Sequence, residues 1–377
     1  MNLILLNKED LQFKQDGVYA VLQGRAHGHC QRILKVTTGT HLRVGVTMAG
    51  VGEAEVVACE SDQTIIKLLE RIDLMPMKQP YKHLEIELLL AVPRPKVLER
   101  LLQLCAVVGI HRIFLICAAR TEKGFLSSSR LSAENIHEHF RLGLEQGMIT
   151  RPPELHAFAS WDGFLAAIRE ADDLEAKGPA ATHIPDAFSE APSAVKNADA
   201  GSTYVLPTLR LVAHPHTEPT LPSLLMRPFA ENPPSAELNG KQVEFQRHSV
   251  LLAVGPEGGW IPPEIDLLQR KLGFLPFSLS DKILKCETAL TACLTQLTMC
   301  YEDPMLFPFL RSPVEIYAAR LARDDKDPER SSDAPESEHK ISRHRGARDI
   351  IRLPGGFLMT FPQRYTTRTN AAEPQQQ

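Results

Sequence analysis

The chain has 377 residues, 43% of them hydrophobic, and a formal net charge of −4. A chain of this length can bury a full core and is expected to form two domains. A protein that grips nucleic acid over a wide face usually carries a basic excess, because phosphate neutralisation drives non-specific binding. The charge balance argues against such a protein, so any RNA contact must come from local basic clusters.

Cysteine usage and the N-terminus indicate the compartment. The seven cysteines are scattered, with no CxxC pair and no Cys/His cluster at zinc spacing, which predicts no metal site. Unpaired cysteines suit a reducing compartment. The first ten residues, MNLILLNKED, have no basic segment before their apolar residues, and a charged side chain appears already at Lys8. No signal peptide is therefore expected. No apolar run reaches membrane-spanning length. We expect a soluble cytoplasmic protein.

The first part of the chain, to about residue 75, reads as short strands. They are predicted at Val18–Leu22, His41–Val46, Gly52–Cys59 and Thr64–Leu69, with a His- and Arg-rich short helix over Gly24–Leu34. A small β-barrel is the natural closure for so many short strands.

The sequence pattern changes near His83, where predicted strands begin to alternate with predicted helices. A nearly continuous apolar strand, as expected when both faces are covered, is followed by amphipathic helices. The elements are a strand at Leu84–Val92, a helix from Pro95 to just before Gly109, a strand at Arg112–Cys117 and a helix from Ser132 to about Gln146. This alternation predicts a parallel α/β sheet.

Polar stretches then interrupt the pattern. Segments 170–208 and 218–241 are predicted to be surface insertions on either side of a short strand, Arg210–Ala213. The pattern resumes with a strand at Ser249–Val254 and ends with a helix over Glu287–Cys300. We therefore expect domains at 1–75 and 76–312, then a charged, flexible tail at 313–377 with a basic cluster, Arg343–Arg352.

The segment Gly255-Pro-Glu-Gly258-Gly259 follows an apolar strand directly, and Pro262-Pro263 open the next helix. Glycines after a strand let the backbone approach a ligand closely. The loop would lie at the carboxyl edge of a parallel strand, where α/β proteins bind ligands. It matches neither a GxGxxG fingerprint nor a Walker loop. A ligand pocket without classical phosphate binding is expected, and an ordinary tight turn is the alternative.

A second segment, Ser278–Ala289, reads SLSDKILKCETA. Phe277–Leu279 is a short predicted strand, and Ile283-Leu284 are apolar residues in a loop, where they would wall a pocket for a flat ring. Glu287 falls in the first turn of a helix, where the helix dipole favours an acid. A plain helix-start acid at Glu287 and a solvated Lys285 are the alternatives to functional roles.

GPEGG followed by SLSDKILKCETA resembles the bacterial 16S ribosomal RNA uridine N3-methyltransferases of the SPOUT superfamily, whose pattern is GPEGG and then SLG-x-R-I-L-R-T-E-T-A. Gly24–Leu34 resembles that family's PUA-like RNA-binding barrel. Leu88–Lys96, Leu144-Glu145-Gln146 and Arg151–Glu154 match its central segments.

The resemblance implies an α/β fold: a C-terminal SPOUT domain with a deep trefoil knot, preceded by a PUA-like barrel. It also implies a homodimer with the site at the subunit interface, acting on ribosomal RNA or the small ribosomal subunit, and S-adenosylmethionine as cofactor. Carried over by motif, the cofactor pocket comprises Ala213, His214, Val254, Gly255, Gly258, Ser278, Leu279, Ser280, Ile283, Leu284 and Thr288.

Some residues depart from the family pattern. Ser280 replaces the Gly of SLG, Lys285 replaces an Arg, and Cys286 replaces a Thr. Lys keeps the charge but loses the planar fork that contacts phosphate or carboxylate bidentately. Ala118-Ala119-Arg120 stands for Ser-Glu-Arg, and Ile149 replaces another Arg. The substrate is therefore less firmly predicted than the cofactor.

Methylation at uracil N3 requires loss of its proton or stabilisation of the anion. Lys285 is predicted to stabilise that anion, with Arg120 as a second candidate; Glu257 and Glu287 could accept the proton, and the base stays unassigned. The target uridine must be unpaired or extruded, since pairing masks N3. Predicted RNA contacts are Arg25, His27, His29, Arg32, Lys35, Arg94 and Arg151, and for the two histidines packing within the fold is the favoured alternative.

Two other functions remain open. One is a SPOUT enzyme acting on another ribosomal or transfer RNA nucleotide. The other is a non-catalytic RNA-binding or ribosome-assembly protein of the same fold. The intact GPEGG and ILKCETA segments favour an enzyme.

Overall fold

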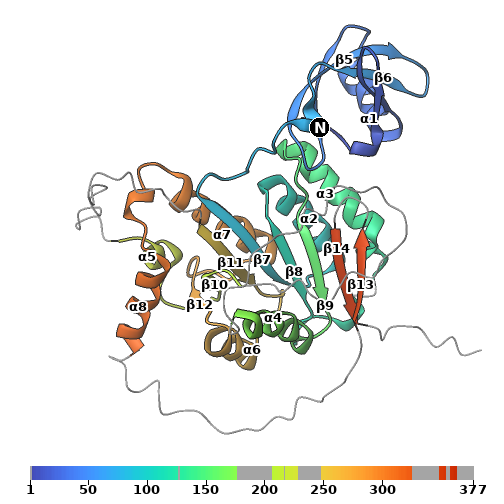
Figure 1. Ribbon diagram of the computed structural model, residues 1–377. Helices are drawn as coiled ribbons and strands as arrows, with labels where there is room; N and C mark the ends of the chain where they lie inside the picture. Colours follow the sequence, from blue (N-terminus) through green and yellow to red (C-terminus); the bar gives the residue numbers. More distant parts are fainter. Residues whose placement is uncertain are drawn as a thin grey trace, which may run out of the picture.

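The computed structural model describes residues 2–125, 128–175, 206–215, 217–227, 248–324, 348–353 and 357–362. Each of its two six-stranded sheets forms a separate lobe, a small N-terminal one and a larger α/β one (Figure 1). The larger lobe contains the candidate site.

The small lobe is a mixed sheet whose strands run in the order β1-β4-β5-β6-β3-β2. β1 pairs with β4 in parallel, and the other pairs are antiparallel. The six strands are β1 (Ile4–Leu6), β2 (Leu11–Lys14), β3 (Gly17–Leu22), β4 (His41–Val46), β5 (Val51–Cys59) and β6 (Thr64–Leu68). All four predicted strands and the short helix α1 (Gly24–His29) are present, whereas β1 and β2 were not predicted because such short runs carry little periodicity.

The larger lobe has a parallel sheet in the order β12-β10-β11-β7-β8-β9. Its strands are β7 (Leu84–Ala91), β8 (Arg112–Ile116), β9 (Glu154–Phe158), β10 (Leu209–Ala213), β11 (His248–Val254) and β12 (Leu275–Phe277). This confirms the predicted alternating α/β architecture. β9 was not predicted, because Pro152-Pro153 directly before it indicate a loop.

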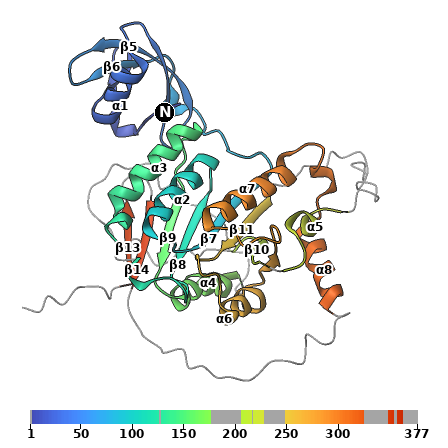
Figure 2. The ribbon, with the colours of Figure 1, turned by 180° about the vertical axis from the view of Figure 1, so that it is seen from behind.

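Helices cover both faces of this sheet (Figures 1 and 2). On one face α2 (Pro95–Val108), α3 (Ala133–Gly147) and α7 (Cys286–Glu302) share a core with Ile86, Leu88 and Leu90. On the other face α4 (Trp161–Glu175) and α6 (Pro262–Asp266) lie over a core that contains Leu89 and Ala91. β7 therefore buries alternate residues in opposite cores, which explains its nearly continuous apolar run.

Two expected surface regions are corrected in part. The insertion expected over 218–241 begins with α5 (Leu221–Leu225), whose buried leucines Leu221, Leu224 and Leu225 belong to the core. The insertion expected over 170–208 begins inside α4, which continues to Glu175. Three leucines in five residues were outweighed by the surrounding proline-rich composition. The rest of both segments lies largely outside the described residues.

The tail expected to be flexible from residue 313 also differs in the structure. It begins with α8 (Pro313–Asp324), and Ile316 is 1% exposed within the core of the larger lobe. Further on, β13 (Arg348–Leu353) and β14 (Phe357–Pro362) form an antiparallel hairpin, and β14 lies beside the edge strand β9 (Figures 1 and 2). Part of the predicted basic cluster, residues 343–347, lies outside the described residues.

None of the described helices is both long enough and apolar enough to cross a membrane.

A charged cluster lies at the end of the sheet where β7 and β8 begin. Glu87 is 4% exposed, and Arg112 Nη1 donates to its Oε1 at 3.0 Å. Ligand atoms of Glu85, Glu87 and His111 come within 4.8 Å of one another, an arrangement that the cysteine and histidine spacing did not predict. Arg112 already supplies positive charge there, so the cluster is balanced by protein groups.

Burial raises the pKa of Glu87 to about 7, and Glu85 and Glu154 add to the rise against the opposing effect of Arg112 and Arg151. The folded state therefore binds the Glu87 proton more tightly than the unfolded state does. The stabilisation from this proton is complete below pH 4.5 and is lost as pH rises through about 7. We expect the loss to be on the order of 3 kcal/mol.

The measurement is the unfolding free energy in urea between pH 4.5 and 7.5, compared with Glu87→Gln. The variant should lack the pH-dependent stabilisation from Glu87. The difference in unfolding free energy between wild type and variant should therefore change steadily across this pH range. The difference also cancels the opposite effect of His156, whose pKa burial lowers to about 4. A difference that stays constant with pH would contradict the assignment.

Candidate cofactor and substrate site

Four loops converge where parallel strands end. They follow β8 at Ala118–Arg120, β10 at Ala213–Pro215, β11 at Gly255–Trp260 and β12 at Ser278–Lys285. Because the strands are parallel, their carboxyl ends share one edge of the sheet, which is where open α/β sheets bind ligands. The two motifs found in the sequence are thereby placed side by side.

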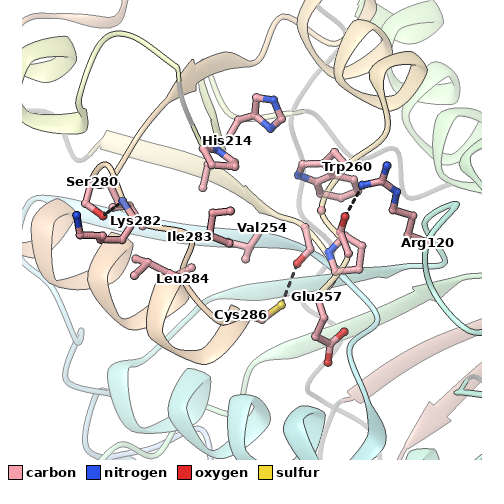
Figure 3. A pocket seen from close by; sticks show the side chains of 18 residues that line it. Arg120, His214, Val254, Glu257, Trp260, Ser280, Lys282, Ile283, Leu284 and Cys286 are labelled. Atoms are coloured by element: carbon pink, nitrogen blue, oxygen red, sulfur yellow. Dashed lines mark hydrogen bonds between the residues drawn. The ribbon is translucent and has the colours of Figure 1, made fainter.

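The loops enclose a pocket of about 390 Å³ (Figure 3). Val254, Leu279, Ile283 and Leu284 give it apolar walls, and His214, Glu257 and Lys282 contribute polar groups. A mostly apolar cavity with a few polar groups is the usual form of a small-molecule site. Ile283 itself is 79% exposed, so this wall is open to solvent in the single chain.

The GPEGG loop is held by two acidic side chains. Glu264, 4% exposed in the first turn of α6, accepts N–H bonds from Ala119 at 2.8 Å, Trp161 Nε1 at 3.0 Å and Ile261 at 3.1 Å. Glu257 Oε1 accepts the backbone N–H of Arg94 at 3.0 Å. Glu264 therefore joins the loop to the end of β8 and to α4, while Glu257 joins it to the start of α2.

Gly255 and Trp260 shape the floor of the pocket. A Cβ on Gly255 would lie 3.1–3.2 Å from the Trp260 indole, which itself is 5% exposed. Glycine is needed here for close approach to the indole. Trp260 was missed in the sequence, although a large aromatic residue directly after two glycines was a signal that could have identified it.

The loops after β11 and β12 are joined through Cys286. Its Sγ donates to the Gly255 carbonyl oxygen at 3.3 Å. Burial raises the pKa of Cys286 to about 11, with a further rise from Glu257, so the thiol stays protonated and can donate. A threonine hydroxyl could donate in the same way, which explains how Cys286 can occupy the Thr position of the motif.

Arg120 lies at the rim of the pocket. Its Nη1 donates to the Gly258 carbonyl oxygen at 2.5 Å. A Cβ on Gly258 would lie 3.1 Å from Arg120 Cδ and 3.2 Å from its Cβ, so the glycine allows the arginine to pass over the loop. The guanidinium remains exposed and carries positive charge at the opening.

The structure brings most of the predicted cofactor residues together. Nine of them line the pocket: Ala213, His214, Val254, Gly255, Gly258, Leu279, Ser280, Ile283 and Leu284. The described pocket lining does not include Ser278 or Thr288. Ser278 is buried, and its N–H donates to the Pro219 carbonyl oxygen at 3.1 Å, whereas Thr288 is exposed on α7.

The predicted catalytic residues differ in their position relative to the pocket. Arg120 lines the pocket, whereas Lys285 and Glu287 are absent from its described lining. Lys285 is exposed directly before α7. The Glu287 carboxylate accepts from Arg100 Nε at 2.6 Å, an ion pair between α7 and α2. In this arrangement Glu287 is engaged away from the pocket.

The predicted RNA contacts are dispersed. Arg32, Lys35 and Arg94 are exposed. His27 Nδ1 lies 2.9 Å from Thr64 Oγ1, and His29 Nε2 is buried without a hydrogen-bond partner in the part of the chain described. Two of the arginines contact other side chains of the protein. Arg25 forms ion pairs with Glu138 and Glu145, and Arg151 contacts the His111 ring.

Comparison with known proteins gives the family. The RNA methyltransferase domain matches residues 80–298, more than half of the chain and all four loops of the pocket. The chain belongs to the RNA methyltransferase domain family. The part of the chain that matches is the larger lobe, from just before β7 into α7.

Individual relatives either match only a short part of this chain or share low sequence identity with it. Ribosomal RNA small subunit methyltransferase E of a Synechocystis species is 47% identical over 54 residues, which span 14% of this chain and 18% of that relative. A Legionella pneumophila structure assigned as a methyltransferase, with the cofactor SAM bound, has 20% identity and a TM-score of 0.51 over 79% of this chain and 97% of that one. A ribosomal RNA small subunit methyltransferase E from Neisseria gonorrhoeae, bound to S-adenosyl methionine, has 15% identity and a TM-score of 0.49 over 79% and 97%.

Proposed function

We propose that this chain transfers a methyl group from S-adenosylmethionine to N3 of a uridine in small-subunit ribosomal RNA. The observation that carries the proposal is the pocket itself, because nine of the predicted cofactor residues, from the two sequence motifs and the loop after β10, line one cavity at the carboxyl edge of the sheet. Family membership and the printed name of the Synechocystis relative support the reaction and the RNA.

The residues fit such a cofactor. Gly255 and Gly258 leave open the space that side chains would fill, and Val254, Leu279 and Leu284 offer apolar walls for a flat base. S-adenosylmethionine supplies an electrophilic methyl group on a sulfonium. The protein contributes positioning, since methyl transfer needs the nucleophile in line with the methyl.

Proton removal and charge stabilisation are assigned to residues at the rim. Arg120, whose guanidinium lies at the opening, and Lys285, exposed directly before α7, would stabilise negative charge on the uracil oxygens. Glu257 lines the pocket and is exposed; its Oε1 accepts from Arg94 N–H, which leaves Oε2 for the proton. Glu287 is less suited because its carboxylate is paired with Arg100.

The trefoil knot and the homodimer remain parts of the proposal. The knot follows from the resemblance of the two motifs, and the hydrogen bond from Cys286 to Gly255 brings the two segments it would involve into contact. In the implied dimer, with the site at the subunit interface, a second subunit would cover Ile283, which is 79% exposed at the pocket wall. The PUA-like barrel as RNA-binding unit, with Arg32 and Lys35 exposed, and a cytoplasmic location belong to the same proposal.

Lys285→Ala tests the assigned anion stabilisation. We expect kcat for RNA methylation to fall roughly 10²–10³-fold, as for loss of one transition-state hydrogen-bond donor. Cofactor affinity, measured by titration calorimetry, should stay unchanged because Lys285 does not line the pocket. The matched control is Lys271→Ala, an exposed lysine of the same lobe that lies outside the pocket lining, which should leave both kcat and cofactor affinity unchanged. If Lys285→Ala kept the wild-type kcat, the role would be assigned to Arg120.

Mapping of the methylated nucleotide tests the substrate. Small ribosomal subunits that lack the modification should gain one N3-methyluridine when they are incubated with the protein and S-adenosylmethionine. Methylation of another nucleotide or of transfer RNA would support the alternative SPOUT enzyme. Cofactor binding without any methylated RNA would instead contradict the proposed reaction.

A further inference from the structure

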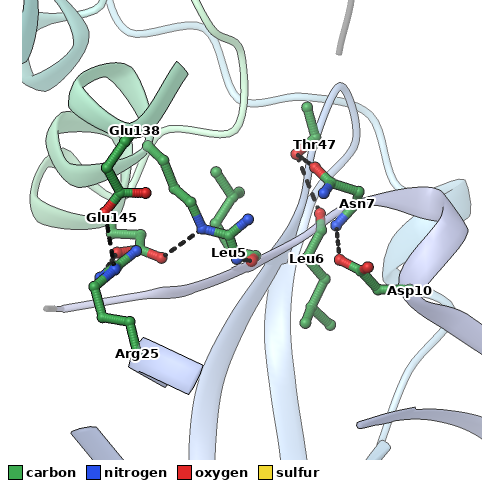
Figure 4. Close-up of polar contacts among 9 residues, drawn as sticks. Leu5, Leu6, Asn7, Asp10, Arg25, Thr47, Glu138 and Glu145 are labelled. Carbon is green, nitrogen blue, oxygen red and sulfur yellow. Dashed lines mark hydrogen bonds and ion pairs between the residues drawn. The ribbon is translucent and has the colours of Figure 1, made fainter. Parts of the chain in front are cut away.

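The contact between the two lobes is built around one carboxylate, Glu145, near the end of α3 (Figure 4). Its side chain is 1% exposed. Arg25 Nη1, from α1 of the small lobe, donates to Oε2 at 2.7 Å, and Arg141 Nε, from α3 itself, donates to Oε1 at 3.3 Å. A buried carboxylate is tolerated when such partners compensate its charge. Glu145 therefore links the helices of the two lobes.

Strand β1 extends this contact. Arg141 Nη2 donates to the Leu5 carbonyl oxygen at 2.5 Å, and the Asn2 N–H donates to the Glu145 carbonyl oxygen at 3.2 Å. Leu3 and Leu5 are buried in the core of the larger lobe, while Ile4 and Leu6 are buried in that of the small lobe. Alternation along one strand thus places its two sides in different cores.

Backbone contacts close the other side of this junction. The Met48 N–H donates to the Thr150 carbonyl oxygen at 2.9 Å, and Thr150 Oγ1 donates to the Ala49 carbonyl oxygen at 2.5 Å. A Cβ on Gly45 would lie 2.8 Å from Thr150 Cγ2, so the two lobes approach closely here. Together these contacts set one orientation of the small lobe.

We propose that Glu145 is a positioning residue, which fixes the small lobe relative to the larger lobe so that RNA in contact with both enters the pocket in one pose. The small lobe lies near the amino end of β9 and the pocket at the carboxyl edge of the sheet, so such an RNA runs along the length of the sheet (Figure 1). The inference rests on the proposed function. An RNA that contacts both lobes spans a set separation, and a lobe held by its linker alone would present the target at lower effective concentration and in many poses. Arg25, predicted as an RNA contact, then acts through Glu145 instead.

The test compares Glu145→Gln with wild type. The amide keeps the shape but loses the charge that Arg25 and Arg141 compensate. We expect KM for small-subunit RNA to rise roughly 10–100-fold, because a loosely held lobe lowers the effective concentration of the target at the pocket. The Kd for S-adenosylmethionine should remain as in wild type. Hydrogen exchange at the Met48 amide should become faster, and methylation should spread to further nucleotides.

Glu138→Gln is the matched control. Glu138 contacts the same Arg25, with Nε to Oε1 at 3.2 Å, but its side chain is 48% exposed. Its KM and the Met48 exchange rate should stay within about threefold of wild type, as expected for an exposed ion pair. If Glu145→Gln does not fold, Arg25→Gln removes the same contact from the small-lobe side, where the side chain is 38% exposed.

The outcomes separate the two proposals. If wild type methylates RNA and Glu145→Gln has unchanged KM or unchanged Met48 exchange, the positioning role is overturned and the proposed function stands. If wild type binds S-adenosylmethionine but neither binds nor methylates RNA, the proposed function fails and the positioning role fails with it. A raised KM with faster Met48 exchange and unaltered cofactor affinity supports the positioning role.

Discussion

Gly258→Arg should abolish detectable binding of S-adenosylmethionine, with affinity weakened at least about a hundredfold. Gly258 lines the pocket, and even a Cβ there would press on Arg120 at 3.1–3.2 Å. A long charged side chain at this position occupies the opening and adds positive charge next to Arg120. Because Gly258 is exposed, the core is not disturbed. The measurement is titration calorimetry with purified protein.

Gly124→Arg is the control for that variant. Gly124 is also exposed, and a Cβ there would meet nothing within 4 Å. It lies outside the pocket lining, so cofactor affinity should remain at the wild-type value. Micromolar binding by wild type and Gly124→Arg but not by Gly258→Arg would locate the cofactor in this pocket. Equal binding by all three proteins would place it elsewhere.

Glu264→Ala should lower the free energy of unfolding by roughly 2–5 kcal/mol. The substitution removes the acceptor of three N–H donors, from Ala119, Trp161 and Ile261, and leaves them to compete for water at a largely buried site. Since these contacts orient the loop that carries Trp260, cofactor affinity should fall as well. Urea denaturation and calorimetry measure the two effects.

Two comparisons make the Glu264 result specific. Glu264→Gln keeps one acceptor oxygen and should lose roughly half as much stability. Asp266→Ala removes another acid of α6, which is 52% exposed and paired with Arg270, and should change stability by less than about 1 kcal/mol. A Glu264→Ala variant as stable as Asp266→Ala would contradict the anchoring role.

The regular elements could be predicted where their periodicity is strong. β7 and α2 were predicted because both of their patterns run over many residues. β9 and α5 were missed because prolines indicate loops there: Pro152-Pro153 directly precede β9, and Pro222 lies within α5. α8 was missed because its charged surroundings masked the buried Ile316.

The candidate site was determined by the sequence to the extent that its residues are local. GPEGG and SLSDKILKCETA each supply a whole loop, so their lining residues were predicted together. What only the tertiary structure decided is which charges meet. Glu287 is paired with Arg100, 187 positions away, and Arg25 with Glu145, 120 positions away. Spacing along the chain carries no signal for such pairs, because the partners are brought together by packing of the sheet and lobes and not by any local period.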